Sequence, residues 1–227
     1  CADKYDFSRE EMDAFGIASV ERARAAMETQ FDAEITPVTV KTRRGETVVT
    51  KDEEPTAINL EKVPALRPAF AKDGTVTAAT SSKISDGAAA TVIMSEEKAA
   101  ELGVTPLATI VAHGMHSQEP GWFTTAPIGA IANVLKKAGW EKDDVDLFEV
   151  NEAFAAVTMA AMSEHDIPHE KINVNGGACA LGHPIGASGA RIVTTLINAL
   201  QQRGLKKGVA ALCNGGGEAT AIAIELP

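Results

Sequence analysis

Short apolar segments alternate with segments of helical spacing along most of this chain, from Thr75 to Glu225. The apolar segments, which predict strands, are residues 89–94, 107–112, 145–150, 171–174, 208–213 and 219–225. The predicted helices are residues 96–102, 128–138, 152–163 and 187–203. Such alternation favours an α/β protein, with helices on both faces of a sheet whose strands are almost continuously apolar. The last two strands lie too close together for a crossover helix, so we expect a mixed sheet in which they pair antiparallel through the turn at 214–217.

The first 74 residues follow a different pattern. Ser8 and Glu11 form a capping-box signature, and apolar residues then recur at helical spacing, which predicts a helix over residues 9–29. Residues 30–74 are polar and contain several prolines, with a short hairpin expected around Arg44-Gly45-Glu46. This region is predicted to be an excursion from the main fold.

Composition excludes several classes of partner. The chain has 227 residues, 45% of them hydrophobic, which indicates a globular core. Its net charge of −10, with scattered Lys and Arg, argues against binding to nucleic acid or to an anionic membrane. No apolar run reaches the roughly 20 residues that cross a bilayer, and no leader pattern stands at the start.

The cysteines and histidines do not suggest a disulfide framework or a metal site. Three cysteines at positions 1, 179 and 213 are far apart, which fits a reducing, cytoplasmic location. The histidine pairs 113/116 and 165/169 have no evident third ligand, so no metal is expected. We therefore expect no metal cofactor.

Two glycine-dense turns present a histidine and a cysteine. His183 lies between Gly182 and Gly186, where an imidazole of ordinary pKa near 6.5 suits proton transfer; alone, it could equally cap a turn. Cys213 ends an apolar strand and precedes three glycines whose N–H groups could form an oxyanion hole, although a buried cysteine alone is more often inert. Cys179, between two alanines, is interpreted as a packing residue.

Asn151 and Glu152 follow the predicted strand 145–150, and the simplest interpretation is an Asn N-cap with an acidic first helical turn. Ligands of such sheets bind beyond the carboxyl ends of the strands. Because Asn151, His183 and Cys213 all follow or end a strand, we expect them to converge. An amino-terminal cysteine can also serve as a nucleophile, which leaves Cys1 as a minor alternative.

Four segments together resemble the thiolase family, and within it the acetyl-CoA acetyltransferases. They are Thr75–Ala78 with Ser85–Ala90, Asn151–Ala155, Gly182–Gly189 and Cys213–Gly217. The resemblance implies a thiolase-like layered fold, with a loop domain at 1–74, the last strand and helix of the first core domain at 75–105, and a βαβαβαββ C-terminal core domain at 106–227. It thus covers the loop domain and the C-terminal part of a thiolase.

The resemblance also implies a reaction: two acetyl-CoA molecules condense to acetoacetyl-CoA and CoA, or the reverse thiolysis occurs, through an acyl-cysteine. His183 would activate the nucleophilic cysteine, and Cys213, with a lowered pKa, would take the α-proton of the second acetyl-CoA. Asn151, through a water, and His183 would stabilise one oxyanion or enolate, and the backbone of Gly215 the other. Coenzyme A enters as substrate or product, with no separate cofactor.

Substrate contacts carried over from the family lie in four short segments. Ser82, Ala78 and Ile84 would touch the pantetheine arm. Phe70, Ala153 and Phe154 would line its channel, and Phe123 would lie at the acyl pocket. Acidic residues at 52–54 stand where many relatives carry a basic residue near the CoA nucleotide.

No segment matches the family's nucleophilic cysteine. The sequence therefore predicts a chain that needs an N-terminal thiolase polypeptide as partner, in a hetero-oligomer. The alternatives are a non-catalytic module that binds acyl-CoA or a partner subunit, and a relative of the ketoacyl synthases.

Overall fold

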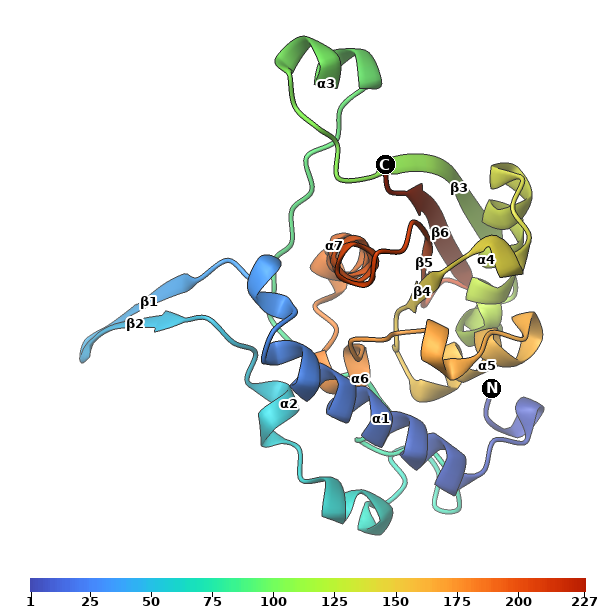
Figure 1. Cartoon of the computed structure of the whole chain (residues 1–227). Coiled ribbons are helices and arrows are strands. Elements are labelled where there is room, and N and C mark those ends of the chain that lie inside the picture. Colours follow the sequence, from blue (N-terminus) through green and yellow to red (C-terminus); the bar gives the residue numbers. More distant parts are fainter.

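The computed structural model describes residues 1–227, and its centre is a four-stranded mixed sheet (Figure 1). The strands are β3 (Thr109–Ser117), β4 (Leu147–Val150), β5 (Lys207–Asn214) and β6 (Glu218–Glu225), in the order β3-β6-β5-β4. β4 and β5 are parallel, whereas β6 is antiparallel to both β5 and β3. The predicted antiparallel pairing of the last two strands is confirmed.

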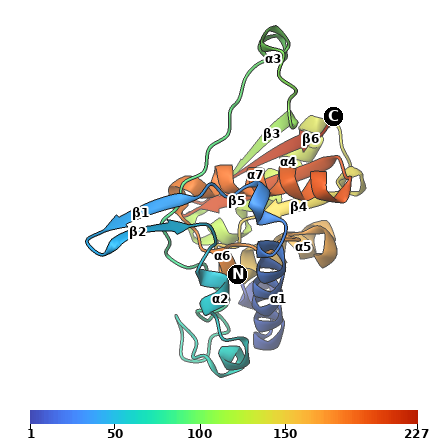
Figure 2. The same ribbon diagram turned by 60° about the vertical axis from the view of Figure 1, so that its left-hand side comes forward.

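Helices cover both faces of this sheet (Figures 1 and 2). α4 (Ala126–Ala138) and α5 (Ala155–His165) lie on one face, and α7 (Ile185–Arg203) lies on the other. In β4 the side chains alternate accordingly: Phe148 and Val150 join the α4–α5 side, and Leu147 joins the α7 side. The predicted α/β class, with helices on both faces, is confirmed.

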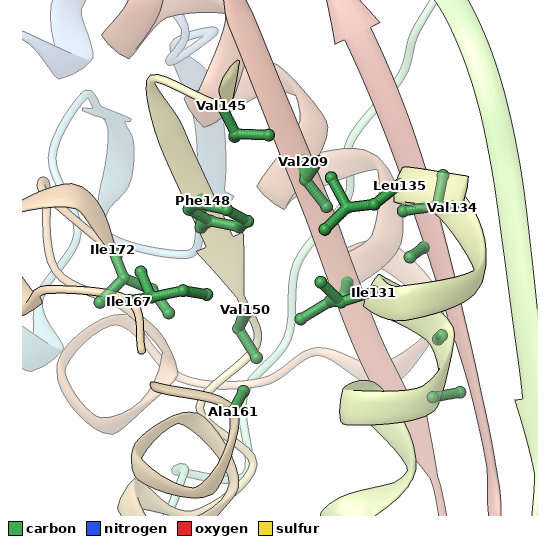
Figure 3. Packing of buried hydrophobic residues seen from close by; sticks show 14 of the residues in the cluster. Ile131, Val134, Leu135, Val145, Phe148, Val150, Ala161, Ile167, Ile172 and Val209 are labelled. Carbon is green, nitrogen blue, oxygen red and sulfur yellow. The ribbon is translucent and has the colours of Figure 1, made fainter. Parts of the chain in front are cut away.

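The larger core lies between the sheet and the pair α4 and α5 (Figure 3). Ile131, Val134 and Leu135 of α4 face Val209 of β5, and Phe148 packs beside Ile172. Cys213 belongs to this same buried cluster. Removal of this apolar surface from water, at about 25 cal/mol per Å², is the main force that holds the layers together.

The N-terminal part is built around α1 (Arg9–Met27), whose Ser8/Glu11 capping box is formed as expected. α1 packs against α6 (Ala178–Leu181) and α5, with Met12 and Phe15 in one cluster with Cys179. The hairpin predicted around residues 44–46 is formed by β1 (Val38–Thr42) and β2 (Gly45–Val49), and it projects from the body (Figure 1). α2 (Glu54–Ala57) follows. Short 3-10 helices span Asp3–Tyr5, Phe31–Ala33, Leu60–Ala65, Pro120–Thr125, Lys142–Asp144 and His169–Lys171.

The strand predicted at 89–94 is wrong. These residues form no strand, and Val92 and Ile93 are 87% and 72% exposed. The apolar composition is that of a buried strand, but no neighbouring strand supplies hydrogen bonds here. The next element, α3 (Glu96–Leu102), has the bounds predicted, and two extended segments hold it away from the body (Figure 1). The final strand expected within 75–105 is therefore not formed.

The strand predicted at 171–174 is reduced to one parallel bridge between Ile172 and Phe148. Asn173 has a φ of 47°, which ends the extended backbone after a single residue. The C-terminal βαβαβαββ order thus lacks its third full strand. The other predicted helices and strands are present, with ends shifted by at most five residues. Within the described chain, no helix is both long and apolar enough to cross a membrane.

Candidate active site

His183 is held in the loop between α6 and α7. Its backbone N–H donates to the carbonyl of Lys83 at 3.0 Å, so the loop rests on the segment around residue 83. Gly182 has a φ of 88°, and a Cβ there would lie 1.9 Å from Ser85 Oγ. Only glycine fits at this position, because it alone combines that backbone conformation with so close a neighbour.

Hydrogen bonds fix the tautomer of the His183 ring. Nδ1 lies 2.6 Å from Ser188 Oγ, and the Ser188 hydroxyl donates its one proton to the carbonyl of Pro184 at 3.1 Å. Ser188 Oγ must then accept from Nδ1–H. Nε2 is left without a proton, which is the form of imidazole that can remove a proton.

Asn151 faces that unprotonated nitrogen. Its Nδ2 lies 3.4 Å from His183 Nε2, and its backbone N–H donates to the carbonyl of Ala211 at 2.9 Å. The residue is 1% exposed, and its Oδ1 has no protein partner. The buried Oδ1 is therefore an acceptor that a water or a substrate group can satisfy.

The surroundings keep His183 neutral. Burial lowers the pKa of the ring, and the positive charge of Arg191 lowers it further. Arg191 projects from α7 and lies 3.7 Å from the buried carboxylate of Glu149. At neutral pH the imidazole is thus unprotonated and ready to act as a base.

Glu152 does not belong to a first helical turn, because α5 begins only at Ala155. Asn151 is therefore not an N-cap, and that simple interpretation is wrong. The Glu152 carboxylate is 1% exposed and accepts hydrogen bonds from Ser19 Oγ (2.7 Å), Asn173 Nδ2 (2.9 Å) and Cys179 N (3.0 Å). It fixes the chain that leads into the His183 loop.

Cys213 lies near the carboxyl end of β5, two residues beyond Ala211, the acceptor of the Asn151 N–H. It is 7% exposed, and burial raises the pKa of its thiol to about 11. The expectation of a lowered pKa is therefore wrong, because an apolar core surrounds the thiol and no cation offsets the cost of a buried thiolate. Cys213 is a thiol at neutral pH.

The glycine turn after Cys213 is closely packed at its far end. Asn214 Oδ1 accepts from Gly216 N at 2.8 Å, and Asn214 Nδ2 donates to Glu218 at 2.9 Å. Gly217 has a φ of 89°, and a Cβ there would lie 2.3 Å from the carbonyl oxygen of Gln118. The N–H of Gly215 has no protein acceptor, so it remains available to an oxygen of a ligand.

Four of the predicted pantetheine and channel residues lie in segments that contact one another. Ser82 N donates to Ala153 O at 3.1 Å, and the ring of Phe70 meets the edge of Phe154 at a centroid distance of 5.8 Å. Ala153 and Phe154 also pack against the cluster that contains Cys213. The backbone of Ser82 and the ring of Phe70 are thus both joined to the segment 153–154, although Phe70 is 74% exposed.

The remaining predicted contacts are less enclosed. Ala78 and Ile84 are exposed, and Ile84 contributes no packing in this structure. Phe123 lies in the 3-10 segment Pro120–Thr125 and packs against the cluster that contains Cys213. Its place at an acyl pocket stays a prediction.

Sequence reasoning missed several residues that hold the site. Ser188 carries the Nδ1 hydrogen bond, although in Gly-Ala-Ser-Gly it resembles an ordinary helix start. Lys83 Nζ donates to the carbonyls of Ala78 (2.9 Å) and Cys179 (3.3 Å), which joins the two segments under the His183 loop. A lone lysine in a polar segment gives no signal for such a bridge.

The other two cysteines have different surroundings. Cys179 is fully buried beside Glu152, and burial together with that carboxylate raises the pKa of its thiol well above the ordinary value. Cys1 is half-buried, with Sγ 3.6 Å from the carbonyl of Ala156. Packing for Cys179, as predicted, is confirmed. No group of three or more His, Cys, Asp or Glu side chains is placed to hold a metal ion.

Comparison with known proteins identifies the family. The model of the thiolase C-terminal domain matches residues 104–226, and that of the thiolase N-terminal domain matches residues 1–97. The chain belongs to the thiolase family. The likeness includes the N-terminal domain model, so it is wider than the loop domain and C-terminal part that the four motifs implied.

Several similar thiolases have names that refer to acyl-CoA chemistry. A probable acetyl-CoA acetyltransferase of Dictyostelium discoideum is 51% identical over 99% of this chain and 55% of its own length. An acetyl-CoA acetyltransferase of Thiocystis violacea is 50% identical over 99% of this chain and 58% of its own length. The crystal structure of the Bacillus anthracis acetyl-CoA acetyltransferase superposes with a TM-score of 0.97 at 47% identity, over 100% of this chain and 58% of that one. The chain thus spans a little over half the length of these thiolases.

Proposed function

We propose that this chain carries the acid–base part of a thiolase site that condenses two acetyl-CoA molecules to acetoacetyl-CoA and CoA, or runs the reverse thiolysis. The observation that carries the proposal is the unprotonated Nε2 of His183, in a ring that Ser188 contacts at Nδ1 and Asn151 contacts at Nε2. The names of the similar thiolases support the acyl-CoA substrate.

In the thiolysis direction, His183 Nε2 takes the proton of a nucleophilic cysteine, and the thiolate adds to the 3-keto carbon. The bond between C2 and C3 breaks, and the acetyl-CoA enolate takes the proton of the Cys213 thiol. The Cys213 thiolate then takes the proton of the incoming CoA thiol, which attacks the acyl-cysteine. The departing cysteine recovers its proton from His183. His183 is then neutral and Cys213 is again a thiol, as at the start.

The substrate oxygen atoms that gain negative charge during the reaction need hydrogen-bond donors. In the proposal, Asn151 orients a water that serves one oxyanion together with His183, and the N–H of Gly215 serves the other. A removed donor of this type typically costs a factor of about 10²–10³ in rate. Ser82, Ala78 and Ile84 contact the pantetheine arm, while Phe70, Ala153, Phe154 and Phe123 line the channel and acyl pocket.

The nucleophile comes from outside these 227 residues in this proposal. Cys213 is used as the acid, and the buried Cys179 has a raised pKa beside a carboxylate. We therefore propose association with an N-terminal thiolase polypeptide that carries the nucleophilic cysteine. The exposed apolar residues Val92, Ile93 and Leu107 support such an association. Three free thiols also support a reducing, cytoplasmic location.

Thiolysis of acetoacetyl-CoA, measured with this chain together with the polypeptide that carries the nucleophile, tests the proposal. His183→Ala and Cys213→Ala should each lower kcat by about 10²–10⁴. Val48→Ala, on the exposed hairpin, serves as the control and should change nothing. Inactive wild-type protein that still binds CoA would overturn the enzymatic proposal.

A second function rests on the exposed ring of Phe70, which meets the edge of Phe154. A non-catalytic module that binds acyl-CoA or a partner subunit would need only the surfaces around Phe70 and Phe154. Calorimetry would then show CoA binding that is unaffected by Cys213→Ala, with no turnover in any combination of chains.

A further inference from the structure

Gln118 connects two loops, the glycine turn after Cys213 and the segment that contains Phe123. It follows directly after β3, and its hydrogen bonds reach both the turn after Cys213 and the segment Pro120–Thr125. Phe123 of that segment packs against the cluster containing Cys213. Nothing in the sequence distinguishes Gln118 from an ordinary polar loop residue.

The backbone of Gln118 holds the glycine turn. Its N–H donates to the carbonyl of Gly217 at 2.9 Å, and its own carbonyl lies where a side chain on Gly217 would stand. The turn carries Gly215, whose N–H is the proposed oxyanion donor. Any displacement of residue 118 therefore shifts the turn.

The side chain of Gln118 holds the other loop. Its Nε2 donates to Thr125 Oγ1 at 2.7 Å and to the carbonyl of Trp122, and Thr125 Oγ1 donates to that same carbonyl at 3.0 Å. The helical conformation breaks at Trp122, with φ −107° and ψ 17°. Both amide protons of Gln118 are thus used at the break, next to Phe123.

His116 fixes the orientation of this amide. Its Nε2 lies 3.2 Å from Gln118 Oε1, and a carboxamide oxygen can only accept, so the ring nitrogen is the donor. His116 itself is paired across β6 with Ala219, which is paired with Cys213 on β5. The anchor of Gln118 therefore lies in the same row of the sheet as Cys213.

We propose that Gln118 is a positioning residue that couples the acyl-facing loop at Phe123 to the glycine turn at Gly215, so that chain-length selection and oxyanion stabilisation are set together. This inference rests on the proposed thiolase function. A tight link between the loops restricts the space beside Phe123 and favours a short acyl group. A broken link widens that space and loosens the oxyanion donor.

Gln118→Glu tests the link, because it preserves shape and the acceptor for His116 but removes both donors. Thr125→Val removes the acceptor on the other side, and Thr125→Ser restores it. Gln202→Glu is the matched control, since Gln202 also donates to a backbone carbonyl, that of Gln30, far from the site. The measured quantity is the ratio of kcat/KM for four-carbon over six-carbon 3-ketoacyl-CoA in the complete enzyme.

Gln118→Glu and Thr125→Val should each lower this ratio about tenfold, the scale of one or two lost hydrogen bonds. Thr125→Ser and Gln202→Glu should leave it unchanged. An unchanged ratio in Gln118→Glu, with only a lower Tm, would show a merely structural role and overturn the proposal.

A second measurement separates this inference from the proposed function. In a Trp140→Phe background, Trp122 is the sole tryptophan, so its emission reports the loop without any substrate. Gln118→Glu should shift that emission. No shift would overturn the coupling, whereas an inactive wild-type enzyme with a clear shift would overturn the thiolase function and the selectivity role but leave the contact confirmed.

Discussion

The loop around His183 and the turn around Cys213 keep their titratable groups neutral for different reasons. His183 forms a hydrogen bond at each ring nitrogen, and burial and the charge of Arg191 lower the pKa of the ring. Cys213 sits at the end of an apolar strand, where burial alone raises its pKa to about 11. One group is therefore an available base and the other an available acid at the same pH. Two environments that push pKa values apart are how a site assigns acid and base roles.

The two loops also differ in the space that they leave for an added side chain. Around His183 the backbone leaves no space, because Ser85 stands against Gly182. Around Gly215 a side chain would meet no neighbouring atom within 4 Å. The His183 loop is thus held by close packing, whereas the turn at Gly215 is anchored only at Asn214 and Gly217. Substitutions in the His183 loop should therefore lower kcat more than substitutions in the turn at Gly215.

Gly182→Ala should produce the largest effect. The new Cβ is incompatible with Ser85 and with the positive φ, so the His183 ring should move by about 1 Å, which can cost about 10²-fold in kcat. Gly186→Ala is the control, because Gly186 has no neighbour within 4 Å and an ordinary φ. Equal activities of the two variants in the thiolysis assay would contradict the packing account.

Ser188→Ala should have a smaller effect. It leaves Nδ1–H without an acceptor and allows the other tautomer, in which Nε2 is protonated, so kcat should fall about tenfold. Thr194→Val removes a similar hydroxyl, which donates to the carbonyl of Ala190 on the same helix α7. If Thr194→Val lowers kcat as much as Ser188→Ala, general damage to α7 and not the tautomer explains the loss.

The pH dependence of thiolysis is the smallest expected effect, because kcat/KM should change little near neutral pH. The base form of His183 is lost as pH falls through its lowered pKa, so the acid limb of kcat/KM should lie below the ordinary imidazole value of about 6.5. The acid form of Cys213 is lost only near its pKa of about 11, so thiolysis should not fall before strongly alkaline pH. An acid limb at or above the ordinary imidazole value would contradict the environment described for His183.

The sequence predicts the elements with strong local patterns better than it predicts the strands at 89–94 and 171–174. Strong local patterns, such as the capping box of α1 and the apolar runs of β5 and β6, predict their elements well. The apolar run at 89–94 fails because a strand also needs a partner, which local composition does not report. The run at 171–174 fails because Asn173 takes a positive φ under tertiary constraints.

The site shows the same division. The glycine turns and Asn151 could be found because unusual residues are close in sequence. Ser188, Lys83 and Gln118 could not, since each acts through contacts with a carbonyl or ring that the fold brings near. The raised pKa of Cys213 was missed for the same reason, because its environment is made by α4, α5 and β6 and not by its neighbours in the chain.

The exchange of the α-protons of acetyl-CoA with solvent deuterium tests the division of roles most directly. In the complete enzyme, wash-in measured by mass spectrometry should require Cys213, while formation of the acyl-cysteine should require His183. Cys213→Ala should therefore abolish the exchange even where the acyl-enzyme has formed, and His183→Ala should form the acyl-enzyme slowly. Full deuterium exchange in Cys213→Ala would contradict the assignment of Cys213 as the group that moves the α-proton.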